Sequence, residues 1–166
     1  MARTTRSPLI AAGILMGAGL GGFLDGIVLH QILQWHNMLS SRIPPNDLVG
    51  AKINMAWDGY FHAGVWVLTV IGLALLWGAG ARRDVPWSGK SFLGSLVLGF
   101  GLFKLIEGLI DHHLLGIHHV YEYTDNKMPW DLGFLIGGGI ALILAGWLIL
   151  RAGRNDIPAG DRPHVA

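Results

Sequence analysis

The chain has no cysteine and few charged residues. Without cysteine it can form no disulfide, no thiolate metal site and no cysteine nucleophile, so any metal ion must be held by His, Asp and Glu. Charged residues make up 14% of the chain and the formal net charge is +1, whereas soluble domains carry about 25% charged residues. Because a nucleic-acid binder needs a basic surface, this charge balance argues against a nucleic-acid partner.

Glycine and apolar residues are abundant instead. The 166 residues include 25 glycines, and 52% of the chain is hydrophobic. Four long apolar stretches each approach the roughly 20 residues needed to cross a bilayer. They predict an all-α integral membrane protein, a single four-helix domain over residues 1–155 followed by a polar tail over 156–166. The expected helices are at about 8–39, 50–80, 89–120 and 131–151.

The distribution of Lys and Arg predicts the orientation of these helices. Eight of the 12 basic residues precede the first helix, lie between the second and third, or follow the fourth, and three lie in the other two loops. Since short cytoplasmic loops are enriched in Lys and Arg, we expect both termini to be cytoplasmic and the loops near 40–50 and 120–130 to be extracytoplasmic.

Small residues recur at four-residue spacing, at Gly13, Gly17 and Gly21 and again at Gly133 and Gly137. This spacing lets helices approach closely in lipid. It predicts close packing within the bundle and offers faces for a homo-oligomer.

The first and third helices share a sequence frame at an offset of 82 residues. GAGLGGFLDGIVLHQILQWHNM from Gly17 aligns without gaps to GFGLFKLIEGLIDHHLLGIHHV from Gly99, and MAWDGYFHAG from Met55 aligns to MPWDLGFLIG from Met128. The chain is therefore expected to consist of two repeated helix hairpins. The matched positions pair Asp25 with Glu107, His30 with His112 and His36 with His118.

Acidic and histidine side chains concentrate at one membrane depth. At a rise of about 1.5 Å per residue, most of them lie between the midplane and the outer leaflet. Ionised carboxylates there cost about 2.5–3.5 kcal/mol each, and Lys104 is the basic residue at this depth, expected to pair with Glu107. A metal ion would supply the remaining positive charge. The candidate ligands are His30, His36, Asp58, His62, Asp111, His112, His113, His118 and His119.

Helical geometry assigns roles within this set. His30, Asp58, His62, Asp111 and His112 lie at similar depth and are expected to bind metal directly. Asp25 and Glu107 lie deeper and are expected to bridge ions, to support a ligand or to act as catalytic carboxylates. On an ideal helix His30 and His112 point about 140° away from these acids. Either several ions are bound, or Gly26 and Gly108 let the helix bulge. The fourth helix is expected to be a packing wall.

Three segments carry a family resemblance: DGIVLHQILQWHNM from Asp25, DGYFHA from Asp58 and EGLIDHHLLGIHHV from Glu107. They resemble the signature segments of a family of predicted bacterial inner-membrane proteins known only as a domain of unknown function. The resemblance implies four helices, an inner-membrane location and an association with respiratory oxidase assembly. The clusters are also similar to the His boxes of membrane desaturases, although the gaps here are longer. The similarity to desaturases therefore implies a His-rich metal site that handles oxygen, and it does not imply their fold or substrate.

These observations favour a membrane metalloprotein with two or more ions near the extracytoplasmic side. Imidazole with carboxylate suits Fe or Zn, with Cu possible. The centre would perform redox or oxygen chemistry, or metal-assisted hydrolysis, on a small or amphiphilic substrate from the outer leaflet. One alternative is a metal-handling factor that uses His36, His118 and His119 as entry ligands. A second alternative is a b-type haem held between His30 and His112. A third is an ion-conducting path, but the cytoplasmic halves of the helices are uncharged, which argues against it.

Overall fold

The computed structural model describes residues 5–156, and in that part of the chain every regular element is helical. Four candidate spans have mean hydropathies from 1.7 to 2.2, which confirms the four-helix membrane architecture. The elements are α1 (Ser7–Leu24), the wider π-helix η1 (Asp25–Ile32), α2 (Leu48–Gly80), α3 (Gly89–Glu107), the π-helix η2 (Gly108–Leu114), α4 (Met128–Gly133), the π-helix η3 (Phe134–Ala141), α5 (Leu142–Ala152) and the 3-10 turn η4 (Gly153–Asn155).

Local sequence signals begin these helices. The side chain of Asp47 accepts a hydrogen bond from the Gly50 amide at 2.7 Å at the start of α2, and Ser88 does the same for the Ser91 amide at 3.1 Å at the start of α3. Such caps satisfy amides that have no partner within the helix. A proline stands in the first turn of α1 and of α4, where its missing N–H costs nothing.

The first and third spans end earlier than expected. They stop at Ile32 and Leu114 instead of near 39 and 120. Gln34 and Gly116 adopt positive φ angles of 52° and 55°, and left-handed backbone of this kind cannot continue a right-handed helix. These two residues are 82 positions apart, so both repeats end their helix in the same way. The chain that follows each end folds back across one end of the bundle and carries His36 and His118 with it.

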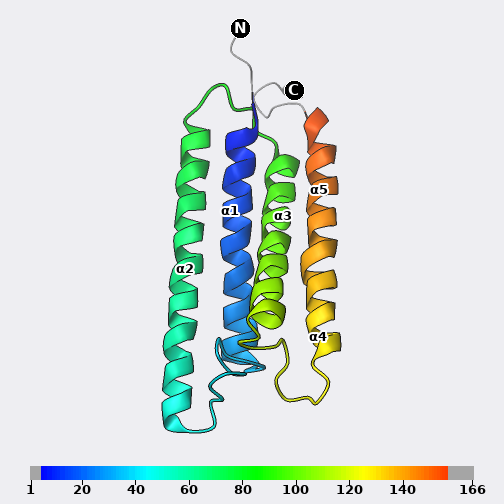
Figure 1. Cartoon of the computed structure of the whole chain (residues 1–166). Coiled ribbons are helices and arrows are strands. Elements are labelled where there is room, and N and C mark those ends of the chain that lie inside the picture. Colours follow the sequence, from blue (N-terminus) through cyan, green and yellow to red (C-terminus); the bar gives the residue numbers. More distant parts are fainter. Residues whose placement is uncertain (1–4, 157–166) are drawn as a thin grey trace.

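Parallel helices α1 and α3 form the centre of the molecule, with α2 against α1 on one side and α5 against α3 on the other (Figure 1). The central pair is in close contact, because a Cβ atom at Gly17 would overlap the Leu96 carbonyl and one at Gly99 would overlap the Ile14 carbonyl. Gly13 and Gly21 also face α3, as expected. Gly133 and Gly137 have open space around them and take no part in packing between helices of this chain.

The distribution of polarity is the reverse of that in a soluble protein. Large apolar side chains such as Trp66 and Trp77 are 59% and 83% exposed along α2, whereas the largest fully buried side chains include many polar ones. A bilayer accepts apolar surface on the outside and forces polar groups inward. The fully buried polar side chains are His30, His118, Asn54, Asp25, Asp58, Asp131, Ser91 and Ser95.

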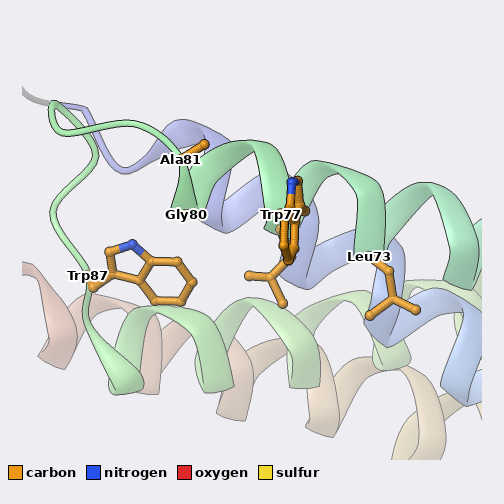
Figure 2. Close-up of a pocket in the computed structure, with 6 residues that line it drawn as sticks. Leu73, Trp77, Gly80, Ala81 and Trp87 are labelled. Atoms are coloured by element: carbon orange, nitrogen blue, oxygen red, sulfur yellow. The ribbon is translucent and has the colours of Figure 1, made fainter.

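An apolar recess lies at the end of the molecule where α2 ends and α3 begins. It encloses about 480 Å³ between the end of α2 and the segment leading to α3, and the rings of Trp77 and Trp87 stand on either side of it (Figure 2). Its lining is hydrophobic, which suits contact with lipid. The lining residues are Leu73, Leu76, Trp77, Gly80, Ala81 and Trp87.

Candidate metal centre

The π-helices η1 and η2 bring each acid and its nearest histidine to one face. In a π-helix the hydrogen bonds run from residue i to i+5, so residues five apart lie close together. Asp25 and His30 are five apart, as are Glu107 and His112. Ideal helical geometry left two explanations for these spacings, several bound ions or a bulge in the helix, and the structure shows the bulge.

Gly26 and Gly108 make room for this widening. A Cβ atom at Gly26 would lie 2.6 Å from Nε2 of His62 on α2, and one at Gly108 would lie 2.9 Å from Leu135 on η3. Both separations are too short for real contacts. Glycine therefore lets each π-helix press against its flanking helix.

Six buried side chains converge at the end of the bundle opposite the termini, three from each repeat. Nε2 of His30 lies 3.2 Å and Nε2 of His36 lies 3.9 Å from Oδ2 of Asp25. In the second repeat, Nε2 of His112 lies 3.4 Å and Nε2 of His118 lies 3.3 Å from Oε1 of Glu107. We call this set the His/acid cluster: Asp25, His30, His36, Glu107, His112 and His118.

The two repeats meet at the rings of His36 and His118. These rings stack with centroids 4.6 Å apart and an interplanar angle of 4°. Each is also in edge contact with the other histidine of its own repeat, at 4.4 Å for His30 with His36 and 4.9 Å for His112 with His118. The cluster thus has an approximate two-fold axis that relates one repeat to the other.

Hydrogen bonds fix the tautomer of three of the four histidines. Nδ1 of His36 donates to the Val120 carbonyl at 2.9 Å, and Nδ1 of His118 donates to the Met38 carbonyl at 3.0 Å, so each repeat orients the histidine of the other. Nδ1 of His30 donates to the Asp58 carboxylate at 2.9 Å. A carbonyl or carboxylate oxygen can only accept, so each Nδ1 carries the hydrogen. In the neutral ring, Nε2 then presents a lone pair.

Two of these Nε2 atoms, those of His30 and His36, face Asp25 without a hydrogen-bond partner, whereas Nε2 of His118 lies within hydrogen-bond distance of Oε1 of Glu107, at 3.3 Å. Among the described residues, Nε2 of His30 and His36, both ring nitrogens of His112, Oδ2 of Asp25 and Oε2 of Glu107 are buried without a hydrogen-bond partner. Two acceptors facing each other in a dry site repel unless a cation lies between them. The cation is either a proton or a metal ion.

The separations fit a metal ion. Ligand atoms about 2.1 Å from an ion lie about 3.0 Å apart at a right angle and about 3.4 Å apart at the tetrahedral angle. Three of the four Nε2–carboxylate separations are between 3.2 and 3.4 Å. A strong hydrogen bond between imidazolium and carboxylate is shorter, about 2.7–2.9 Å; of these contacts, the one between His118 and Glu107 is a long hydrogen bond at 3.3 Å. Two overlapping groups have compatible spacing: His30 with His36 and His118, and Glu107 with His112 and His118.

His36 and His118, which lie beyond the ends of the spans, differ in basicity. Burial lowers the pKa of His36, and the neighbouring histidines add to this effect, while the nearby carboxylate of Asp25 opposes it. Burial also acts to lower the pKa of His118, but the hydrogen bond and negative charge of Glu107 outweigh it, and the net pKa is raised. Compared with a free imidazole, His36 therefore favours the neutral form and His118 favours the protonated form.

Lys104 makes the two halves electrically different. It is 5% exposed, its Nζ forms a close ion pair with Oδ1 of Asp25, and it lies 4.5 Å from the ring centroid of Phe134. The expected pairing with Glu107 is wrong, because the lysine side chain reaches across to α1. Gly22 occupies the equivalent position in the first repeat. Asp25 is thus neutralised within the chain, whereas the described residues provide no Lys or Arg partner for Glu107.

Asp58 and Asp131 form a second layer of acids behind the cluster. Besides His30, Asp58 accepts from the Asn37 side chain and the Met38 amide, each at 2.8 Å. Asp131 accepts from the Val120 amide at 3.0 Å and from Nδ1 of His119 at 2.6 Å, and Nδ1 of His112 lies 3.6 Å away. Such carboxylates orient the ligating imidazoles of metal sites.

Asp131 was missing from the set expected from the sequence. The signal was present in the alignment of the second and fourth helices, which places Asp131 over Asp58 at an offset of 73. The fourth span contributes Asp131 at its start and, between residues 132 and 150, no member of the cluster. That part of the helix is a packing wall, as expected.

Several expected ligands lie outside the cluster. Nδ1 of His62 donates to the Asp58 carbonyl one turn earlier at 2.7 Å, and the ring lies against Gly26 and Phe23, away from the cluster. His113 is exposed, and Asp111 is half-buried on the side of η2 that faces α2. His119 contacts Asp131 behind the cluster. Asp58 acts through His30 and lies behind it, so the expected direct ligands that join the cluster are His30 and His112.

The fold and the cluster define a helical membrane protein with four spans and a buried His/carboxylate group at one end. The family model described as "Predicted membrane protein (DUF2243)" matches residues 12–153, and the chain belongs to that family. No significant match was found among the curated proteins or the solved structures. Membership confirms the resemblance drawn from the three His-bearing segments.

Proposed function

We propose that this protein is a membrane metalloprotein with a two-ion non-haem centre in the His/acid cluster. The observation that carries the proposal is the orientation of the imidazoles. Nδ1 of His30 and Nδ1 of His36 are committed as donors, so their buried Nε2 atoms, which have no hydrogen-bond partner, point at Asp25, and among residues 5–156 Lys104 is the one Lys or Arg paired with the carboxylates of the cluster. Two divalent ions would supply the missing charge.

Each repeat supplies two histidines and one carboxylate: Asp25 with His30 and His36, and Glu107 with His112 and His118. Sets of two histidines and one carboxylate with open positions are typical of non-haem Fe(II) sites that handle oxygen. We therefore favour iron and redox chemistry. Zinc in the same positions would lower the pKa of a bound water and support hydrolysis.

Two alternatives fit the geometry less well. A haem clamped between His30 and His112 would need a gap between the helices, whereas the four imidazoles of the cluster are packed with successive centroids 4.4–4.9 Å apart. A metal-handling factor would need reachable entry ligands, but of the three expected ones His36 and His118 are 2% and 0% exposed, and the half-buried His119 contacts Asp131 behind the cluster. The buried, locked cluster suits an ion that stays in place.

Metal analysis together with an optical spectrum of the purified protein tests this proposal. Protein prepared without chelator is expected to hold about two equivalents of iron or zinc per chain. Iron would show charge-transfer bands in the near-ultraviolet or visible range, and zinc would leave the protein colourless. A Soret band with stoichiometric haem would contradict the proposal and favour the haem alternative.

We further propose that the centre lies on the extracytoplasmic side of a bacterial inner membrane. The end of the bundle where α1 begins and α5 ends (Figure 1) also carries Arg82, Arg83, Lys90, Arg151 and Arg154, and the cluster lies at the opposite end, around η1 and η2. The positive-inside rule then places the cluster outside.

Cysteine labelling tests this orientation, because the chain has no native cysteine. In intact cells an impermeant maleimide is expected to label Asn46→Cys and Asp125→Cys, and to label Lys90→Cys only after the membrane is opened. Labelling of Lys90→Cys alone in intact cells would reverse the orientation without affecting the metal site.

A further inference from the structure

A groove of about 460 Å³ leads from the lipid-facing surface to the His/acid cluster. Ile106 and Ile110, which line it, are 54% and 41% exposed and mark its open side. Its volume lies within the roughly 300–1,000 Å³ usual for small-molecule sites. The groove runs between α2 and α3 over α1, and its lining is apolar apart from two acids: Ile14, Ala18, Phe61, Leu68, Gly99, Leu102, Phe103, Ile106, Glu107, Ile110 and Asp111.

The inner end of the groove shares its wall with the cluster. Glu107 lines the groove and also faces His112 and His118, and its Oε2 has no hydrogen-bond partner. Phe61 stacks on His30 with centroids 5.5 Å apart and lies 6.0 Å from the ring of Phe103. A molecule in the groove would therefore contact a carboxylate of the centre beside the paired rings of Phe61 and Phe103.

Asp111 gives the groove a polar end that lipid chains do not require. It is half-buried at the groove, and no hydrogen bond or ion pair to its side-chain carboxylate is found among residues 5–156. A carboxylate at this depth is costly unless a donor meets it. At the offset of 82 residues, Asp111 of the second repeat corresponds to Leu29 of the first, and Ala18 of the first corresponds to Phe100 of the second. The groove therefore combines a small residue from one repeat with an acid from the other, and the equivalent pair, Phe100 and Leu29, offers neither.

We propose that this groove admits the substrate of the centre, a membrane-dissolved molecule with a hydroxylated aromatic ring and an apolar tail. The phenolic hydroxyl would donate to Asp111 or to Oε2 of Glu107, the ring would pack against Phe61 and Phe103, and the tail would lie along Ile14, Leu68 and Leu102. This inference rests on the proposed function, because it names the substrate class of the same centre.

Photo-crosslinking in lipid nanodiscs tests the groove directly. The probe is 4-octylphenol with a diazirine on its tail, and labelled peptides are mapped by mass spectrometry. Labelling is expected within residues 61–68 and 99–111, with competition by 4-octylphenol at least about 10-fold stronger than by 4-octylanisole, its methyl ether without the donor. Ala18→Phe, which fills the groove, should abolish this labelling, whereas Ala11→Phe on the exposed face of the same helix should leave it unchanged.

Asp111→Leu, which copies the other repeat, should remove the preference for the phenol over the ether. Equal competition by phenol and ether in the wild-type protein would show that the groove holds lipid chains only and would overturn the inference. Metal content is measured in the same samples. Groove labelling in protein that binds no metal would contradict the proposed centre while leaving the binding site intact, so the two failures are distinguishable.

Discussion

Replacing His118 by alanine is expected to remove nearly all bound metal. Nε2 of His118 belongs to both groups of candidate ligands, and its ring stacks on His36 at the axis between the repeats. Loss of a residue that merely orients a ligand typically costs 10- to 100-fold in affinity, so loss of a shared ligand should cost more than about 100-fold. Equilibrium dialysis against Fe(II) or Zn²⁺, followed by elemental analysis, measures the effect.

His113→Ala is the matched control for this experiment. His113 lies in the same HHLLGIHH segment but is exposed and outside the cluster, so its loss should leave the metal content unchanged. Circular dichroism confirms that both variants remain helical. Equal metal content in the two variants would remove His118 from the centre and return it to a structural role between the loops.

Replacing Lys104 by methionine is expected to make the stability of the protein depend on metal. Lys104 neutralises Asp25, and removing one partner of a buried ion pair costs about 3–5 kcal/mol. For a chain of this size, such a loss corresponds to a drop in Tm of about 6–20 °C in the metal-free protein. Bound metal supplies the lost charge, so addition of metal should raise the Tm of the variant more than that of the wild type. Thermal unfolding in detergent, with and without chelator, measures both effects.

The double variant Lys104→Met with Asp25→Asn separates charge from packing. It removes both charges of the pair, and its metal-free Tm should recover most of the loss seen in Lys104→Met. If the double variant is as unstable as the single one, Lys104 stabilises the protein by packing against Phe134 and Gly138 and not by neutralising Asp25.

The sequence was sufficient to predict the architecture. Apolar length identified all four spans, and the offset of 82 residues identified a repeat that the structure shows in Gly17 and Gly99, in His36 and His118, and in the positive φ angles at Gln34 and Gly116. The helix ends were misplaced because Gln34 has no special preference for left-handed backbone, which is typical of glycine. Its conformation follows from the loop that packs on the second repeat.

Which residues join the His/acid cluster was harder to predict, because this depends on the type of helix and on the direction in which each side chain points around the helix axis. Counting depth on ideal α-helices placed His62 and Asp111 beside His30, but depth does not distinguish the face toward the bundle from the face away from it. A π-helix turns less per residue than an α-helix, and this difference brings His30 and His112 onto the same face as their acids. Gly26 and Gly108 were the signal for it.

X-ray absorption of the metal-loaded wild-type protein tests the central claim most directly, because it reports the ligands of the ion itself. We predict a first shell of N and O atoms at about 2.0–2.2 Å with the outer-shell pattern of imidazole, about two ions per chain, and loss of the imidazole pattern in His118→Ala. A folded protein that takes up no iron, zinc or copper, or an ion whose shell lacks imidazole, would contradict it.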